Sequence, residues 1–284
     1  MWGILAEWKE RKIPTEKVGD INIYYEIRGK GEPLLMISGY GDSSEVWFCQ
    51  ITGLCREYRV VLFDNRGAGR SDKPDIPYTM QIFAQDTAGL LEALAIDAAH
   101  IYGVSMGGMI AQEFTLRYPE KVVSLILGCT GCGGPYAVMP DEEATTLLLD
   151  QERAKRLTPE EMVRESLPFM FSQEFIDNNL DIVEQFIAKQ VEYFPPFRGF
   201  MRQAEAIIGH DTYDRLPQIK APTMVISGTA DRLVPVENSR ILASTIPNAE
   251  LVLLEKAGHG YFVEAAEEAN KAILDFLRRH RRSG

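Results

Sequence analysis

Short apolar runs alternate with helical patterns along most of this chain, and this alternation constrains the fold more than any other feature. Glycine, proline or charged residues bound each run, which indicates strands buried on both faces. Four such runs are PLLMIS (33–38), YRVVLFD (58–64), IYGV (101–104) and KVVSLILG (121–128). Apolar residues recur at helical spacing in residues 46–57, 79–96 and 106–118. Buried strands that alternate with helices predict an α/β fold with a mostly parallel sheet flanked by helices.

The alternation stops in the middle of the chain and resumes near its end. From about residue 135 to 215 the sequence is rich in helical patterns and poor in strand patterns. It then continues with the strands APTMVISG (221–228) and AELVLLE (249–255), a helix over 235–245 between them and a last helix over 264–280. We therefore predict a core of residues 1–134 and 216–284 that carries an inserted helical cap, residues 135–215. Insertions in such sheets extend the loops at the carboxyl edge of the strands, so the cap should lie there.

Composition excludes several classes of partner. The chain has 284 residues and is 45% hydrophobic, which is enough for one large core with an insertion. Its net charge of −11 repels phosphate backbones, so we expect no nucleic-acid partner. No apolar stretch reaches the roughly 18 residues that span a bilayer, and the start MWGILAEWKERK has too short an apolar part for a secretion signal. A cytoplasmic protein without membrane association is expected.

Two short features leave alternatives open. The first dozen residues are amphipathic. They would form a short helix packed on the body or on a partner subunit, or a loosely docked terminus. A homo-oligomer is therefore a possible partner arrangement. Cys129 and Cys132 form a CxxC motif without a second such motif. We expect ordinary buried thiols there, with a redox or metal pair as the alternative. No metal or cofactor is predicted.

The motif that carries chemistry is G-V-S-M-G, from Gly103 to Gly107. It follows the predicted strand 101–104 and opens the predicted helix 106–118, which is the setting of a nucleophile elbow. A strained turn there points the Ser105 hydroxyl out of the sheet edge. Side chains at Gly103 and Gly107 would collide with the neighbouring strand and helix. Ser105 is the predicted nucleophile.

A serine nucleophile needs a base, and the chain has four histidines. His259 lies in a glycine-flanked loop between the last strand and the last helix, at the carboxyl edge. An extended stretch separates His100 from the serine, and His280 lies in a run of arginines. His210, near the end of the cap, is expected to be structural. We therefore predict His259 as the base.

The acid that orients this base should lie on a third loop at the same edge. Asp231 follows the strand 221–228, and its alternative role is a turn or helix N-cap aspartate. Asp211 and Asp214 lie outside the loops of the sheet. The predicted order Ser105, Asp231, His259 matches the order of a triad in this fold.

Acyl transfer also needs donors for the developing oxyanion. The backbone N–H of Met106, which follows the nucleophile, is one candidate. The second is the N–H of Tyr40 in the glycine-rich loop SGYGDSSEVW (38–47), where glycines let the backbone approach closely. A plain glycine-rich turn is the alternative for this loop.

Five segments together resemble the α/β-hydrolase fold family, in its serine-nucleophile branch. They are SGYGDSSEVW (38–47), DNRGAGRSD (64–72), GVSMGG (103–108), GTADRLVP (228–235) and AGHGYF (257–262). Within the family the chain is similar to small bacterial esterases, enol-lactonases and cofactor-free haloperoxidases with helical caps. The resemblance implies that Tyr40 and Met106 form the oxyanion hole and that Asp64 and Arg66 are structural. Many members have His-Gly where this chain has Ser38-Gly39.

These residues predict a cofactor-independent serine hydrolase that cleaves a small-molecule carboxylic ester or lactone. A carbon–carbon bond hydrolase of the ring-cleavage type could use the same residues, and a hydrolase-fold ligand receptor with slow turnover is the third alternative. The cap is rich in aromatic residues, so an apolar acyl or alcohol group is expected. Gly39, Trp47 and Tyr261 are predicted near the substrate, with core packing as the alternative for Trp47 and Tyr261.

Overall fold

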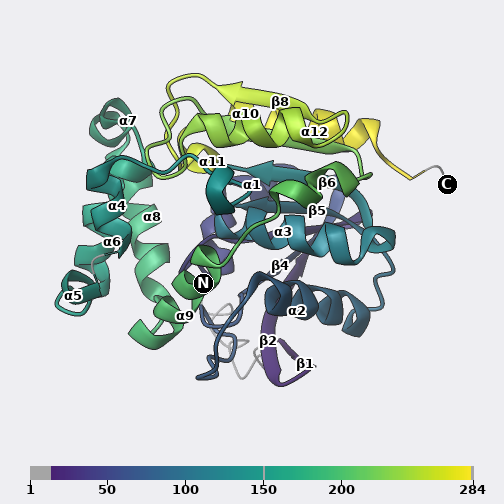
Figure 1. Cartoon of the computed structure of the whole chain (residues 1–284), viewed down its shortest axis with the longest axis horizontal. Helices are drawn as coiled ribbons and strands as arrows, with labels where there is room; N and C mark the ends of the chain where they lie inside the picture. Colours follow the sequence, from purple (N-terminus) through teal and green to yellow (C-terminus); the bar gives the residue numbers. More distant parts are fainter. Residues whose placement is uncertain (1–13, 150, 283–284) are drawn as a thin grey trace, which may run out of the picture.

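An eight-stranded sheet organises the structure, a computed structural model that describes residues 14–149 and 151–282. The strand order is β1-β2-β4-β3-β5-β6-β7-β8 (Figure 1). The strands are β1 (Thr15–Val18), β2 (Ile21–Arg28), β3 (Glu32–Ile37), β4 (Tyr58–Phe63), β5 (Ala99–Val104), β6 (Val122–Gly128), β7 (Thr223–Gly228) and β8 (Glu250–Leu254). Within those ranges no helix has the length and apolar composition needed to cross a bilayer. The predicted docking of the first dozen residues lies outside the described residues.

Neighbouring strands from β4 to β8 pair in parallel, and β2 pairs antiparallel with both β1 and β4. The predicted mostly parallel α/β sheet is therefore confirmed. Successive residues of the central strand β3 point to opposite faces: Leu34 and Met36 belong to one apolar cluster, and Leu35 and Ile37 belong to the other. All four side chains are fully buried. A strand buried on both faces explains why this run lacks alternating polar residues.

Helices cover both faces of the sheet. One face packs against α2 (Met80–Ala93), α3 (Met106–Arg117) and α10 (Val236–Thr245). The other packs against α1 (Phe48–Leu54), α11 (Tyr261–Glu264) and α12 (Ala266–Arg279). The described residues also form the 3-10 helices η1 (Ser44–Trp47), η2 (Pro119–Lys121), η3 (Gly134–Tyr136) and η4 (Tyr213–Gln218). The helix expected over 46–57 is thus shorter and begins as a 3-10 turn, and the last expected helix is split at Ala265.

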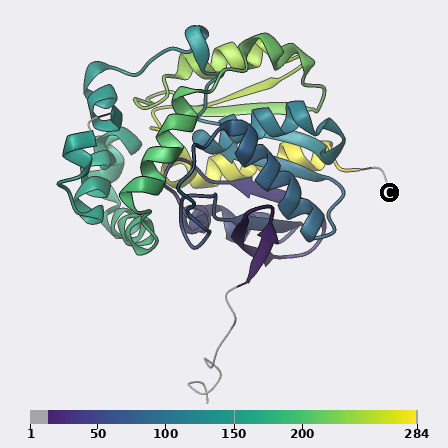
Figure 2. The ribbon, with the colours of Figure 1, turned by 60° about the horizontal axis from the view of Figure 1, so that its bottom comes forward.

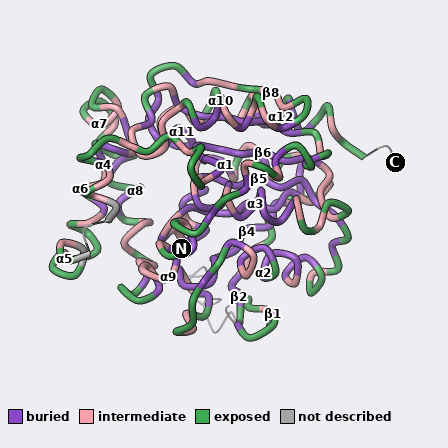
Figure 3. The backbone as a smooth tube through the Cα atoms, in the orientation of Figure 1, coloured by how far each residue is buried: buried purple, intermediate pink, exposed green. Residues whose placement is uncertain are grey.

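A group of helices lies between β6 and β7 in the sequence and gathers at one end of the molecule (Figures 1 and 2). It comprises α4 (Glu142–Leu149), α5 (Gln151–Ala154), α6 (Pro159–Met170), α7 (Gln173–Asn178), α8 (Leu180–Glu192) and α9 (Phe197–Ile208). We call this group the cap. Thr158 and Glu161 form a capping box at the start of α6. Figure 3 shows the central strands buried and much of α7 exposed, so the cap packs on the core with only part of its surface.

Candidate active site

Ser105 occupies a sharp turn between β5 and α3. Its backbone has φ 53° and ψ −123°, which is strained for a residue with a side chain. A Cβ on Gly103 would lie 2.1 Å from the Gly107 carbonyl oxygen, and a Cβ on Gly107 would lie 2.1 Å from that of Ile37. The turn therefore requires glycine at both positions. Every residue of β5 is buried, whereas Ser105 is half-buried.

The surroundings of Ser105 hold the turn in place. The Ser105 N–H donates to the Gly128 carbonyl at 2.9 Å, and the Thr130 hydroxyl donates to the Ser105 carbonyl at 2.8 Å. Met106 is the first residue of α3, where a helix has no partner of its own for the N–H. The positive end of the α3 dipole thus lies beside the serine.

His259 and Asp231 are paired at the same edge of the sheet. His259 Nδ1 lies 2.8 Å from Asp231 Oδ2, and both side chains are buried. The other carboxylate oxygen, Oδ1, accepts the N–H groups of Leu233 and Val234 at 2.9 and 2.8 Å. Asp231 therefore acts as a turn aspartate and as the partner of the imidazole at once. Its carboxylate is held so that it faces Nδ1, which leaves Nε2 for other contacts.

The other histidines lie in different settings. His100 lies within β5 with Nδ1 2.7 Å from the Ser124 hydroxyl. His280 follows the last residue of α12. His210 lines the cavity described next, and burial lowers its pKa to about 4. Asp211 pairs in a β-bridge with Gly133, and no hydrogen bond described for residues 14–149 and 151–282 joins it to a histidine. Only His259 combines the cavity with a carboxylate partner.

A cavity of about 720 Å³ lies between the cap and the carboxyl edge of the sheet, and Ser105 and His259 both line it. The described hydrogen bonds do not join these two side chains, a common state before substrate binds. The wall of the cavity is mostly apolar and includes Met109, Met162, Phe186, Phe194, Phe200 and Phe262. Three of the cap aromatics thus line the cavity. The cavity suits a ligand with a sizeable apolar part.

Residues 38–47, which we call the oxyanion loop, pass over Ser105. Tyr40 and Met106 both line the cavity, and no acceptor within the described ranges pairs with the Tyr40 N–H. The Ser38 hydroxyl donates to the Asp42 carbonyl at 3.3 Å, and Asn65 Nδ2 donates to the Ser38 carbonyl at 3.1 Å. These contacts anchor the loop where many family members have histidine.

Two of the three residues expected near the substrate lie in the core, whereas Gly39 lies beside Ser105. A Cβ on Gly39 would be 2.8 Å from Asp42 Oδ2 and 3.4 Å from Ser105 Cβ. Trp47 is fully buried, with its ring 4.9 Å from that of Tyr102 on β5. Tyr261 is also fully buried, and its hydroxyl lies 2.9 Å from the Tyr102 hydroxyl. Both aromatic side chains turn away from the cavity because they fill the apolar core between β5 and α11.

Two residues outside the predicted site contact the oxyanion loop or the cavity. Asp42 lines the cavity, and its Oδ1 accepts a hydrogen bond from Gln190 Nε2 at 2.8 Å. Gln203 Oε1 accepts the Gly41 N–H at 2.8 Å. A signal for Gln203 existed, because it shares the buried face of α9 with Gly199 and Ala206. A polar residue on an apolar helix face is commonly hydrogen-bonded.

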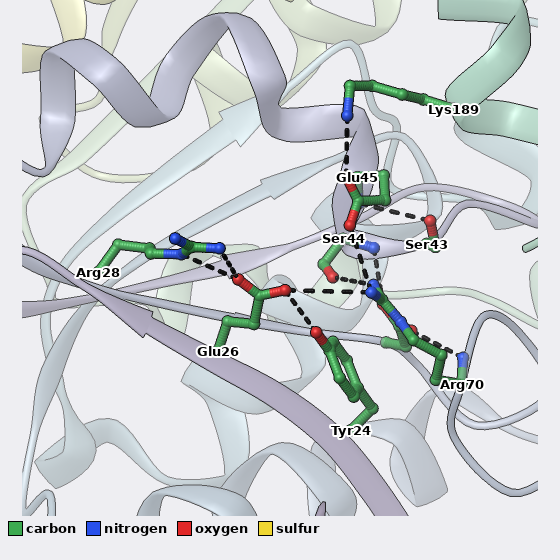
Figure 4. Close-up of polar contacts among 9 residues, drawn as sticks. Tyr24, Glu26, Arg28, Ser43, Ser44, Glu45, Arg70 and Lys189 are labelled. Carbon is green, nitrogen blue, oxygen red and sulfur yellow. Dashed lines mark hydrogen bonds and ion pairs between the residues drawn. The ribbon is translucent and has the colours of Figure 1, made fainter. Parts of the chain in front are cut away.

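A polar network joins the oxyanion loop to β2 and to the cap (Figure 4). Glu45 accepts from Lys189 Nζ of α8 at 2.9 Å and from Arg70 Nη1 at 3.2 Å. Arg70 also pairs with the buried Asp64 at 2.8 Å and stacks between the rings of Tyr24 and Tyr193. The loop that carries Tyr40 is therefore held from the core and from the cap at once.

The CxxC motif consists of two buried thiols. Cys129 and Cys132 are free and buried, and burial raises the pKa of both thiols. Thiols that stay protonated are poor nucleophiles and metal ligands. Among residues 14–149 and 151–282, no three His, Cys, Asp or Glu side chains gather as a metal site would require.

Known proteins resemble this chain over nearly its whole length. A family model described as alpha/beta hydrolase fold matches residues 32–266. A putative carbamate hydrolase RutD from Azorhizobium caulinodans is 30% identical over 93% of this chain and 98% of its own. The enol-lactonase from Burkholderia xenovorans superposes with a TM-score of 0.82 at 26% identity, over 93% of this chain and 100% of its own. A thermophilic esterase from Thermogutta terrifontis has a TM-score of 0.81 at 29% identity, over 92% and 95%.

The family match spans the segments that form the candidate site. The matched range contains the oxyanion loop, the elbow at Ser105 and the Asp231–His259 pair. This chain therefore belongs to the alpha/beta hydrolase fold family of hydrolases.

Proposed function

We propose that the protein is a cofactor-independent serine hydrolase that cleaves a carboxylic ester or lactone with a sizeable apolar group. The observation that carries the proposal is the Asp231–His259 pair, 2.8 Å apart, on the wall of the cavity that Ser105 also lines. A serine beside an imidazole that is itself paired with a carboxylate forms an acyl-transfer site.

In the proposed mechanism, Ser105 Oγ attacks the carbonyl carbon and His259 Nε2 takes the hydroxyl proton. The N–H groups of Tyr40 and Met106 stabilise the negative charge on the carbonyl oxygen. Collapse of this intermediate breaks the carbon–oxygen bond, and the imidazolium gives its proton to the leaving alkoxide. Water, deprotonated by His259, then attacks the acyl carbon, and the imidazolium returns the proton to Ser105 Oγ as the acid leaves. Asp231 holds the imidazole in the required tautomer throughout.

The cavity supports the choice of an ester or lactone with an apolar group. The relatives named putative carbamate hydrolases make carbamate the rival substrate. Carbamate is an anion of a few atoms and would occupy little of a cavity of about 720 Å³ with mostly apolar walls. An acyl or alcohol chain of several carbons would bury its surface against Phe186, Phe194 and Phe200.

A substrate panel tests the proposal. Wild type and Ser105→Ala are assayed with p-nitrophenyl esters of increasing acyl length, with aliphatic lactones, with a ring-cleavage dienoate and with carbamate. We expect kcat/KM to rise with acyl length and Ser105→Ala to abolish turnover of esters and lactones. Retention of full activity in Ser105→Ala, or turnover of carbamate alone, would overturn it.

A further inference from the structure

Asp42 is a half-buried carboxylate in the cavity wall that the proposed mechanism leaves unused. Its Oδ1 accepts from Gln190 Nε2 of α8 at 2.8 Å. Within the described ranges no lysine, arginine or histidine forms an ion pair with it. The other acid of the wall, Glu165, is paired with Arg153 at 2.6 Å. Asp42 is therefore the carboxylate of this wall that lacks a cationic partner among the described residues.

The carboxylate lies next to the nucleophile. The point where a Cβ on Gly39 would lie is 2.8 Å from Asp42 Oδ2 and 3.4 Å from Ser105 Cβ. Asp42 Oδ2 therefore lies at most about 6 Å from Ser105 Cβ, close enough for the first carbons of an acyl group on Ser105 to approach it. A hydrogen-bond donor on the first or second carbon after the carbonyl would be within reach of this oxygen.

A carboxylate that has lost part of its hydration is costly unless donors surround it. Burial raises the pKa of Asp42 to about 6, while the hydrogen bond from Gln190, the nearby His259 and the Gly39 backbone lower it. Near neutral pH the group is mostly ionised and accepts hydrogen bonds. A donor on the substrate would offset part of the desolvation cost, and an apolar substrate would not.

We propose that Asp42 is a specificity-determining residue that selects esters or lactones with an O–H or N–H donor on the first or second carbon from the scissile carbonyl. This inference rests on the proposed ester or lactone hydrolysis and names its substrate class. The preferred substrate combines such a donor near the carbonyl with an apolar chain that fills the rest of the cavity. The competing explanation is that Asp42 only ties the oxyanion loop to α8 through Gln190.

Matched substrates separate these explanations. One pair is p-nitrophenyl butyrate and p-nitrophenyl 3-hydroxybutyrate, which differ by one hydroxyl group. A second pair is N-hexanoyl-homoserine lactone and its N-methyl derivative, which lacks the N–H. The measured quantity is the ratio of kcat/KM within each pair, because a general loss of activity cancels in this ratio. We expect wild type to prefer the donor-bearing member of at least one pair by about tenfold, typical of a hydrogen bond to a charged group.

Asp42→Asn keeps the shape of the side chain but leaves it with one oxygen that can accept a hydrogen bond. If that oxygen stays bonded to Gln190, the amide NH₂ faces the cavity and opposes a donor. We expect this variant to lose the preference or invert it, and Asp42→Ala to bring the ratio to about one. Glu45→Gln is the matched control, because this acid lies on the same loop but outside the cavity wall, so the ratio should stay as in wild type.

The experiment distinguishes a failure of the Asp42 inference from a failure of the proposed hydrolase function. The absence of any ester or lactone turnover that depends on Ser105 would overturn the function itself. Turnover that depends on Ser105 but shows no preference in wild type would overturn the role of Asp42 alone. A wild-type preference that persists in both Asp42 variants would overturn it as well.

Discussion

Gln203 of the cap helix α9 accepts a hydrogen bond from the backbone N–H of Gly41 over 2.8 Å. The same side chain donates to the Arg66 carbonyl over 2.8 Å and is fully buried. Gly41 directly follows Tyr40, the proposed oxyanion donor, and the Tyr40 ring stacks on Phe200 of the same helix with centroids 4.0 Å apart. One helix of the cap therefore holds the backbone of the oxyanion loop.

Replacement of Gln203 by Met should lower catalysis more than substrate binding. The change leaves the buried Gly41 N–H without its acceptor, at a cost of about 1–3 kcal/mol in stability. Because a displaced Tyr40 N–H weakens stabilisation of the transition state only, we expect kcat to fall about tenfold to hundredfold with a smaller change in KM. Steady-state kinetics with a p-nitrophenyl ester measure both. Glu205→Gln, an exposed change on α9, is the control, and an equal loss of kcat there contradicts the prediction.

Relief of the strain at Ser105 should stabilise the fold while it removes activity. A non-glycine residue at φ 53° and ψ −123° costs about 1–3 kcal/mol, which glycine largely avoids. Part of that gain is offset by the greater freedom of glycine in the unfolded chain. We expect Ser105→Gly to be more stable than Ser105→Ala by about 1 kcal/mol, measured by urea unfolding. Equal midpoints for the two inactive variants would show that the turn is not strained.

Asp231→Asn should leave the fold intact and remove most of the activity. The Asn carbonyl oxygen can still accept the N–H groups of Leu233 and Val234. Its NH₂ would then face His259 Nδ1 and favour the wrong tautomer. In a well-studied triad enzyme this change lowers kcat by about four powers of ten. We expect a loss of at least about a thousandfold with an unchanged circular dichroism spectrum, and a loss of less than tenfold would contradict the assigned role.

Stability should depend on pH through Asp42. Burial raises its folded-state pKa from 3.8 to about 6. Between these values the folded protein binds a proton that the unfolded chain does not, so the contribution of this group falls as pH rises from about 4 to about 6. Relative to Asp42→Asn, wild type should lose about 1–3 kcal/mol across this window. Urea unfolding of both proteins at several pH values measures the difference, and parallel pH profiles would exclude the raised pKa.

Much of the fold follows from local sequence patterns. The apolar runs of β3 to β7 mark strands buried on both faces, the run of β8 marks a partly buried edge strand, and helical spacing marks the helices between them. The elbow is local as well, because a strand, the residues from Gly103 to Gly107 and a helix adjoin in the sequence. The close approach of Gly103 to Gly107 and of Gly107 to Ile37 shows why glycine is required there. The positions of Asp231 and His259 follow from a general rule, since the loops after parallel strands meet at one edge.

Tertiary packing decided which side chains of these loops face the cavity. Trp47 and Tyr261 lie on the expected loops, yet their rings pack against Tyr102 in the core, whereas Asp42 of the same loop as Trp47 lines the cavity. Gln203 contacts a loop 162 residues away in the sequence. Loop residues lack the fixed periodicity that assigns a side chain to a face of a strand or helix. Their directions depend on contacts between segments distant in sequence, which only the assembled core and cap provide.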